Sequence, residues 1–149
     1  MKRIISIIFI LFLVGCSNQK YIKCDIEINN QKEEYEIIGI YKIYYDDNFV
    51  TQIEKKEKNI TNNEDMIDYF KESKNLEYYK LNDLYSGFDY TINSSYNYID
   101  LSAVIILSEV NIKNMVKDGY IDKDYTISNK LTTSGIVKYY ESKGAICNI

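Results

Sequence analysis

Apolar and polar residues alternate along segment 24–29. Cys24, Ile26 and Ile28 fall on one face, and polar side chains fall on the other. A period of two residues is typical of a strand with one buried face. The pattern therefore predicts a strand whose Cys24 side chain points toward the core.

A longer apolar run, 35–45, is rich in Ile and Tyr and predicts a central strand buried on both faces. Asp46-Asp47-Asn48 follows, and alternation resumes from Phe49 to about residue 58. Two strands joined by three turn-forming residues predict a hairpin. A calcium loop needs six to eight oxygens from a longer, spaced set, so turn geometry explains these three residues better.

A second strand pair is predicted after Gly87. Residues 88–92 alternate, Asn93-Ser94-Ser95 predicts a turn, and an apolar run returns within 96–110. Asp100 lies inside that run and is the only acid whose burial would be unexpected. An outward-facing position, or a satisfied turn at a bulge, is the simpler interpretation.

Helical signals separate and follow these strands. Thr61 and Glu64 fit a capping box at the start of a helix over 61–75. A short helix is predicted over 112–118, and a last one over 133–143 with Thr133 or Ser134 as its cap. Gly144 stands where the residue after a helix adopts the left-handed conformation. The chain thus predicts an α+β fold, with a mainly antiparallel sheet of about four to five strands and two or three helices packed on it.

Segment 1–15 has a different character. Lys2 and Arg3 precede the run 4–14, which only Ser6 interrupts. A charged start before roughly 7–15 apolar residues is typical of a secretory signal, whereas a membrane-spanning helix needs about 20 apolar residues. Residues 1–15 are therefore predicted to be a signal peptide.

The segment Leu13-Val14-Gly15-Cys16 resembles a bacterial lipobox. The resemblance implies that diacylglycerol alkylates the Cys16 thiol and that a peptidase cuts before this residue. Two or more acyl chains give stable membrane anchoring. We expect a lipid-anchored protein on the cell membrane, facing outside the cytoplasm, with diacylglyceryl-Cys16 as its contact with the membrane. Residues 16–23 would form the lipidated cysteine and tether, and 24–149 a single domain.

Lipidation of Cys16 leaves Cys24 and Cys147 as an even pair in a compartment where disulfides persist. We expect a bridge between them, which would tie the first strand to the last residues of the chain. Two free buried thiols are the alternative. A metal site is not expected because the chain contains no His to accompany the two thiolates.

The net charge of the chain without residues 1–15 limits the classes of partner that we expect. Removing Lys2 and Arg3 from the 18 basic residues leaves 16 against 22 acidic ones, a net charge of −6. No cluster of Lys or Arg alternates with aromatic residues, so nucleic acid is not an expected partner. Segment 16–149 has a length that suits one domain with a single core.

The residue types available for catalysis are few. The chain has no His for general-base chemistry, and pairing would leave no thiol as a nucleophile. Paired carboxylates are enough for a glycosidase, but no pair stands out among the 22 acids. The 16 tyrosines are better explained by core and half-buried strand positions than by sugar stacking. No catalytic residue, cofactor or metal is predicted.

Several of these features together resemble the YehR-like family of small bacterial lipoproteins, which has no established activity. They are the lipobox, Cys24 soon after it, the hairpin segment DDNFVTQI, the strand segment NYIDL and the closing GAIC. The resemblance implies an α+β fold and a surface location, and it supplies no catalytic residues.

We therefore expect a non-catalytic lipoprotein that binds a ligand or supports the envelope, with an envelope protein or a glycan as its candidate partner. The alternatives are a cell-surface carbohydrate-active enzyme using carboxylates and a surface-exclusion lipoprotein acting against phage or conjugation. A pocket that gathers tyrosines and carboxylates would favour binding.

Overall fold

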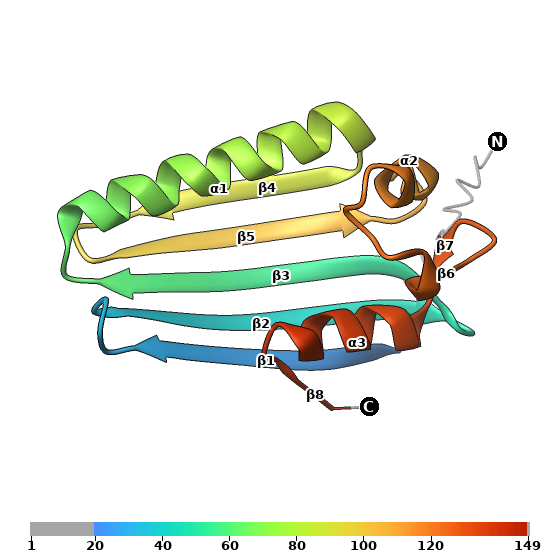
Figure 1. The fold of residues 1–149 in the computed structure, drawn as a ribbon, viewed down its shortest axis with the longest axis horizontal. Coiled ribbons are helices and arrows are strands. Elements are labelled where there is room, and N and C mark those ends of the chain that lie inside the picture. Colours follow the sequence, from blue (N-terminus) through green and yellow to red (C-terminus); the bar gives the residue numbers. More distant parts are fainter. Residues whose placement is uncertain (1–19, 149) are drawn as a thin grey trace, which may run out of the picture.

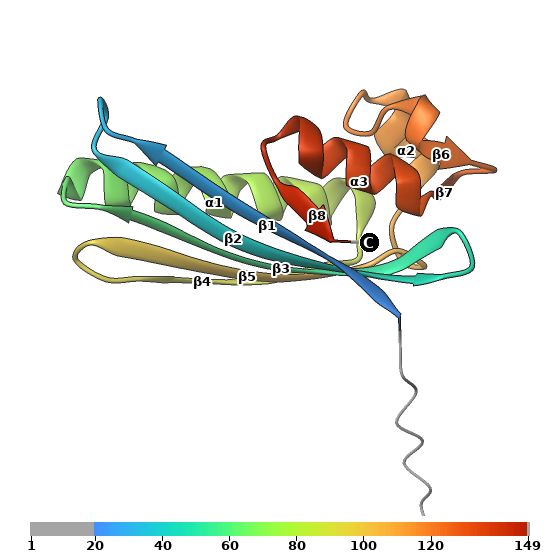
Figure 2. The same cartoon turned by 90° about the horizontal axis from the view of Figure 1, so that it is seen from below.

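The computed structural model describes residues 20–148. Six of its strands form one antiparallel sheet, and the helices of this part of the chain lie on one face of that sheet (Figures 1 and 2). The sheet strands are β1 (Tyr21–Asn30), β2 (Tyr35–Asp46), β3 (Phe49–Thr61), β4 (Phe88–Ser94), β5 (Tyr98–Ile106) and β8 (Ile146–Asn148). The remaining elements are α1 (Glu64–Tyr85), α2 (Ile112–Lys117), the 3-10 helix η1 (Lys123–Tyr125), β6 (Thr126–Ile127), β7 (Lys130–Leu131) and α3 (Thr133–Ser142). The predicted α+β class is confirmed.

The strand order is β4-β5-β3-β2-β1-β8. The first three strands form a meander. The chain then returns along the sheet as α1, and β5 pairs with the free edge of β3 while β4 pairs with β5 (Figure 1). The last strand, β8, returns to pair with β1. The two ends of the described chain therefore meet at one edge of the sheet (Figure 2).

The prediction that segment 35–45 is buried on both faces was wrong. Tyr41 and Ile43 are buried in β2, but Ile38 and Ile40, which occupy the alternate positions just before them, are 41% and 40% exposed. The helices cover only one face of the sheet, so apolar residues that alternate with the core positions face solvent.

The first predicted helix is displaced and longer. Thr61 belongs to β3, where it pairs with Tyr35, and Asn63 is the N-cap of α1 because its side chain accepts hydrogen bonds from the Asp65 and Met66 amides. The helix continues past its predicted end at 75, as far as Tyr85. It stops where Ser86 and Gly87 adopt positive φ angles of 60° and 73°.

The other boundaries lie close to their predicted positions. β1 begins at Tyr21, slightly ahead of Cys24. The N-cap of α3 is Thr132, whose hydroxyl accepts from the Gly135 amide, immediately before the predicted caps. Gly144 adopts the predicted left-handed conformation, with φ at +91°.

The core consists of two adjoining clusters between the sheet and the helices. One joins β1, β2 and β3 to α3, and the other joins β4 and β5 to α1 and α2. Ile105, Leu107 and Ile121 contact both clusters. Among the described residues, both clusters are built from segment 22–147. In this part of the chain, no helix combines the length and the apolar character required to cross a bilayer.

Candidate functional site

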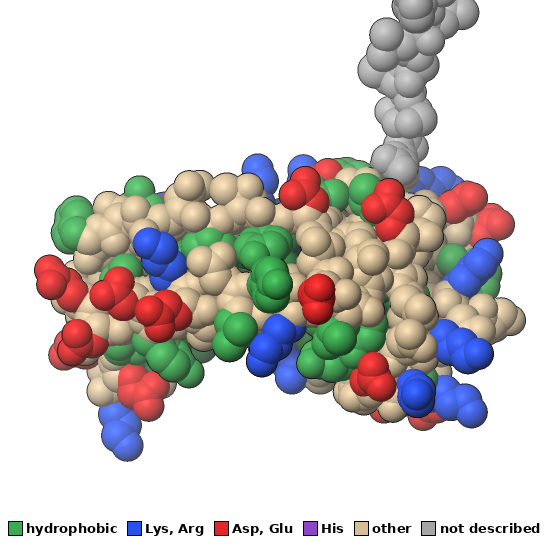
Figure 3. Space-filling model, turned by 90° about the horizontal axis from the view of Figure 1, so that it is seen from above, with side chains coloured by type: hydrophobic (Ala, Val, Ile, Leu, Met, Phe, Trp, Pro, Cys, Tyr) green, Lys and Arg blue, Asp and Glu red, His purple; other side chains and the backbone are tan. Residues whose placement is uncertain are grey.

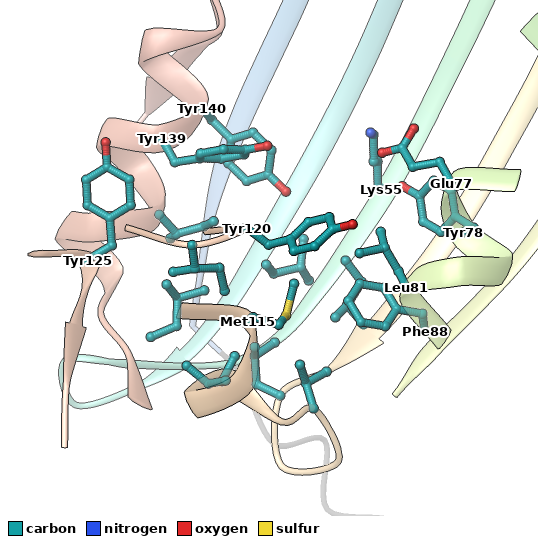
Figure 4. Close-up of a pocket in the computed structure, with 18 residues that line it drawn as sticks. Lys55, Glu77, Tyr78, Leu81, Phe88, Met115, Tyr120, Tyr125, Tyr139 and Tyr140 are labelled. Carbon is teal, nitrogen blue, oxygen red and sulfur yellow. The ribbon is translucent and has the colours of Figure 1, made fainter. Parts of the chain in front are cut away.

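A cavity of about 200 Å³ lies where the two core clusters meet. Its floor is the sheet, and α1, α2, η1 and α3 supply its walls (Figure 4). The lining is mainly apolar and aromatic: Ile53, Lys55, Glu77, Tyr78, Leu81, Phe88, Ile105, Leu107, Val110, Ile112, Met115, Tyr120, Ile121, Tyr125, Leu131, Ile136, Tyr139 and Tyr140. The cavity therefore gathers five tyrosines with one carboxylate, Glu77, and one ammonium group, Lys55.

The polar residues of the lining are not spread evenly. Figure 4 shows Lys55, Glu77 and Tyr78 together on one side of the cavity, whereas Phe88 and Met115 lie away from Lys55. One end of the cavity is thus apolar, and hydrogen-bonding groups converge at the other.

A buried ion cluster adjoins the polar end. Glu57, only 6% exposed, receives Lys55 Nζ at 3.1 Å on Oε2 and Lys74 Nζ at 3.1 Å on Oε1. The Tyr41 hydroxyl donates to Oε2 at 3.2 Å, and Asn59 Nδ2 donates to Oε1 at 3.3 Å. Each carboxylate oxygen therefore has two donors, the condition under which a buried charge is tolerated.

Glu57 and Lys55 both stay charged in this cluster. Burial acts to raise the pKa of Glu57, but Lys55 and Lys74 outweigh it and lower that pKa to about 2. Burial acts to lower the pKa of Lys55, yet Tyr78 and Glu57 beside it leave the pKa above its ordinary value. Lys55 is consequently an ammonium group at any physiological pH.

Tyrosines surround this ammonium group. Lys55 Nζ lies 5.4 Å from the centre of the Tyr41 ring and 5.8 Å from that of Tyr78, within the range of cation–π attraction. Tyr140 stacks on Tyr41 with the ring centres 4.6 Å apart. Burial raises the pKa of Tyr78 and of Tyr140, so both hydroxyls stay protonated and can donate hydrogen bonds.

Close packing of α3 on η1 determines where the tyrosines of these two elements lie. A Cβ added to Gly135 would lie 2.6 Å from the Cα and the carbonyl oxygen of Tyr125. Only glycine allows this approach, which brings Tyr125 of η1 and Tyr139 and Tyr140 of α3 to the same cavity.

Sequence reasoning missed Lys55 and Glu57. Segment 54–58 is a run of charged residues, which suggests a solvated strand face. A usable signal was present, because Lys55, Glu57 and Asn59 continue the buried face of Ile53 at a period of two. The cavity itself had no local signal, since its residues come from many separate elements and the loops between them.

The predicted disulfide is present in the structure. Cys24 of β1 and Cys147 of β8 lie directly opposite each other in the antiparallel register, with their Cα atoms 4.0 Å apart. Cys24 is fully buried, as the alternation predicted. Cys16, the predicted lipidation site, lies outside the described residues.

Asp100, the acid whose burial would be unexpected, lies in an outward-facing position. The Asp100 side chain is 42% exposed, and Lys58 Nζ lies 3.6 Å from its Oδ1. The buried acid is Glu57 instead.

Asp47 adopts a positive φ of 51° in the turn between β2 and β3. Residues 20–148 hold no group of three or more side chains suited to a metal.

A second apolar surface lies outside the cavity. Leu76 and Tyr79, on the outer side of α1, are 54% and 64% exposed, and with Tyr90 of β4 they line a shallow depression. The view onto this side shows apolar side chains gathered at its middle (Figure 3). This surface provides positions on the same helix that do not line the cavity.

Comparison with solved structures finds two proteins with a similar fold. No family model and no curated protein matches the chain. The NMR structure of Escherichia coli YehR superposes with a TM-score of 0.57 at 14% identity, covering 87% of this chain and 92% of that one. The NMR structure of a protein from Streptococcus pneumoniae TIGR4 gives a TM-score of 0.52 at 10% identity, covering 99% of this chain and 94% of that one. The chain therefore has the YehR-like fold.

Proposed function

We propose that this chain is a lipid-anchored extracytoplasmic protein with a non-catalytic binding role, and that its ligand occupies the cavity between α1, α2 and α3. The observation that carries the proposal is the cavity itself, which is mainly apolar and has a few polar groups converging at one end. An apolar cavity of about 150 Å³ accepts benzene. A cavity of about 200 Å³ suits a somewhat larger molecule.

The chemistry of the site favours binding over catalysis. A lysine that acts as a nucleophile needs a lowered pKa so that it can be uncharged. The pKa of Lys55 is raised, and its ammonium group is paired with Glu57. The chain contains no His, and Cys24 and Cys147 are bonded to each other.

The anchoring part of the proposal rests on the lipobox-like segment ending at Cys16. Because β1 begins at Tyr21, only segment 17–20 would separate the lipidated residue from the domain. A segment of this length spans at most about 14 Å. The domain would therefore sit close to the bilayer.

Replacing Cys16 tests the anchor. Without the thiol that accepts diacylglycerol, Cys16→Ser should show no metabolic labelling with a fatty acid and should keep segment 1–15 uncleaved. Cys147→Ser is the matched control, and it should still be labelled. Labelling of the Cys16→Ser protein would refute the proposed anchor.

A cavity-filling pair tests the binding site. Leu81→Trp should occupy part of the cavity, whereas Leu76→Trp places the same ring on the outer side of the same helix. Since a ligand that binds only the folded state raises the melting temperature, octan-1-ol should stabilise residues 17–149 of the wild type and of Leu76→Trp but not of Leu81→Trp. Thermal unfolding with increasing octan-1-ol measures this. Equal stabilisation of both variants, or none of the wild type, would contradict the proposed site.

A further inference from the structure

The polar end of the cavity holds two lysines and two glutamates, and the two acids are shared unequally between the lysines. Lys55 and Lys74 both contact Glu57, the one buried carboxylate of the described chain. Lys74 has a second acidic partner, Glu77 Oε2 at 3.7 Å. Within residues 20–148, Lys55 has Glu57 alone.

Lys55 also keeps hydrogen-bonding capacity toward the cavity. An ammonium group has three donors; one serves Glu57 and another serves the Tyr78 hydroxyl oxygen, which leaves one. Within residues 20–148, the hydroxyls of Tyr41 and Tyr85 donate to carboxylates, whereas those of Tyr78 and Tyr140 do not. The hydroxyls of Tyr78 and Tyr140, on side chains that are more than nine-tenths buried, therefore remain available beside Lys55.

The unused groups of Lys55, Tyr78 and Tyr140 are hydrogen-bond donors, so they favour a ligand that carries an acceptor. Glu57 itself is saturated by four donors and offers nothing to a ligand. Glu77 is the acidic group of the lining, and its side chain is half-exposed and lies beside Lys74. A carboxylate at this end would meet the ammonium group of Lys55 and the two hydroxyls, while Glu77 is paired with Lys74.

The geometry points to a specific ligand class: an apolar carboxylate of about ten non-hydrogen atoms, with its hydrocarbon part among Leu81, Phe88 and Met115 and its carboxylate beside Lys55. A short fatty acid or a small aryl-alkanoic acid has this chemistry. The inference rests on the proposed function, because it names the ligand class of the same cavity.

Three probes of one chain length test it on residues 17–149. Octanoate, octan-1-ol and octylammonium share the apolar part and differ in the charge of the head. Octanoate should bind about tenfold more tightly than octan-1-ol, because charge-assisted hydrogen bonds are roughly twice as strong as neutral ones, and octylammonium should bind most weakly. Lys55→Met, which keeps the apolar stem, should remove the preference for octanoate over octan-1-ol.

The outcomes separate this inference from the proposed function. If octan-1-ol or octylammonium binds at least as tightly as octanoate, the carboxylate is wrong while the cavity remains a binding site. If none of the three probes binds, the proposed function fails. A preference for octanoate that persists in Lys55→Met would overturn the role of Lys55, and should this variant not fold, the comparison of the three probes on the wild type decides alone.

Discussion

Cys147→Ser should lower the free energy of unfolding of residues 17–149 by about 2–5 kcal/mol. The bond joins residues 123 positions apart, and a loop of this length confines the unfolded chain strongly. β8 is very short, and the register pairs it with Lys23, Cys24 and Asp25 alone. Without the bond, we expect β8 to separate from β1 and expose the edge of the sheet where the two ends of the domain meet.

Denaturant unfolding with and without reductant measures this effect. Reducing the wild type should reproduce the stability of the Cys147→Ser variant, and reductant should leave that variant unchanged. A thiol titration of the oxidised, unfolded wild-type domain should find no free thiol. Two reactive thiols in that titration, or equal stability of the wild type with and without reductant, would rule out the bridge.

Glu57→Gln should be destabilising by about 3–5 kcal/mol, the range for removing one member of a buried ion cluster. The amide keeps the shape of the side chain but leaves Lys55 and Lys74 without their shared negative charge. Asp100→Asn is the matched control. It removes a carboxylate from a neighbouring strand on the open face, where an exposed pair with Lys58 contributes about 1 kcal/mol or less.

The same carboxylate sets an acid dependence of stability. Its pKa is about 2 in the folded protein and 4.5 in the unfolded reference, so the unfolded chain binds the proton more readily between these values. Stability from this group is therefore complete above about pH 5 and is lost as the pH falls toward 2, by roughly 3 kcal/mol. Urea unfolding as a function of pH should show this loss in the wild type and in Asp100→Asn. An unchanged slope in Glu57→Gln would mean that another group causes it.

Local patterns predicted the parts of the fold whose signals are local. Alternation placed Cys24 on the buried face, and Gly144 marked the end of the last helix through its left-handed conformation. The Thr61 capping box failed for a tertiary reason, because pairing with Tyr35 holds Thr61 in β3 and leaves Asn63 to cap α1. Local capping propensity is weaker than a ladder of strand hydrogen bonds.

The candidate site was less predictable because it depends on which face is covered. Ile38 and Ile40 look like core residues and face solvent, whereas Lys55 and Glu57 look like surface residues and are enclosed. Burial is decided by α1 and α3, which come from distant parts of the chain, and their tyrosines provide the surroundings in which the ion cluster is stable. No window of neighbouring residues contains that information.

The measurement that tests the binding cavity most directly uses the two methionines of residues 17–149. Met115 lines the cavity, whereas Met66 lies at the start of α1 beside Thr61, outside the lining. With ¹³C-labelled methionine methyl groups, the NMR spectrum contains one reporter at the site and one internal reference. Addition of octanoate should shift the Met115 methyl signal in a saturable way and leave the Met66 signal in place. A Met115 signal that does not move, or equal movement of both signals, would contradict the account.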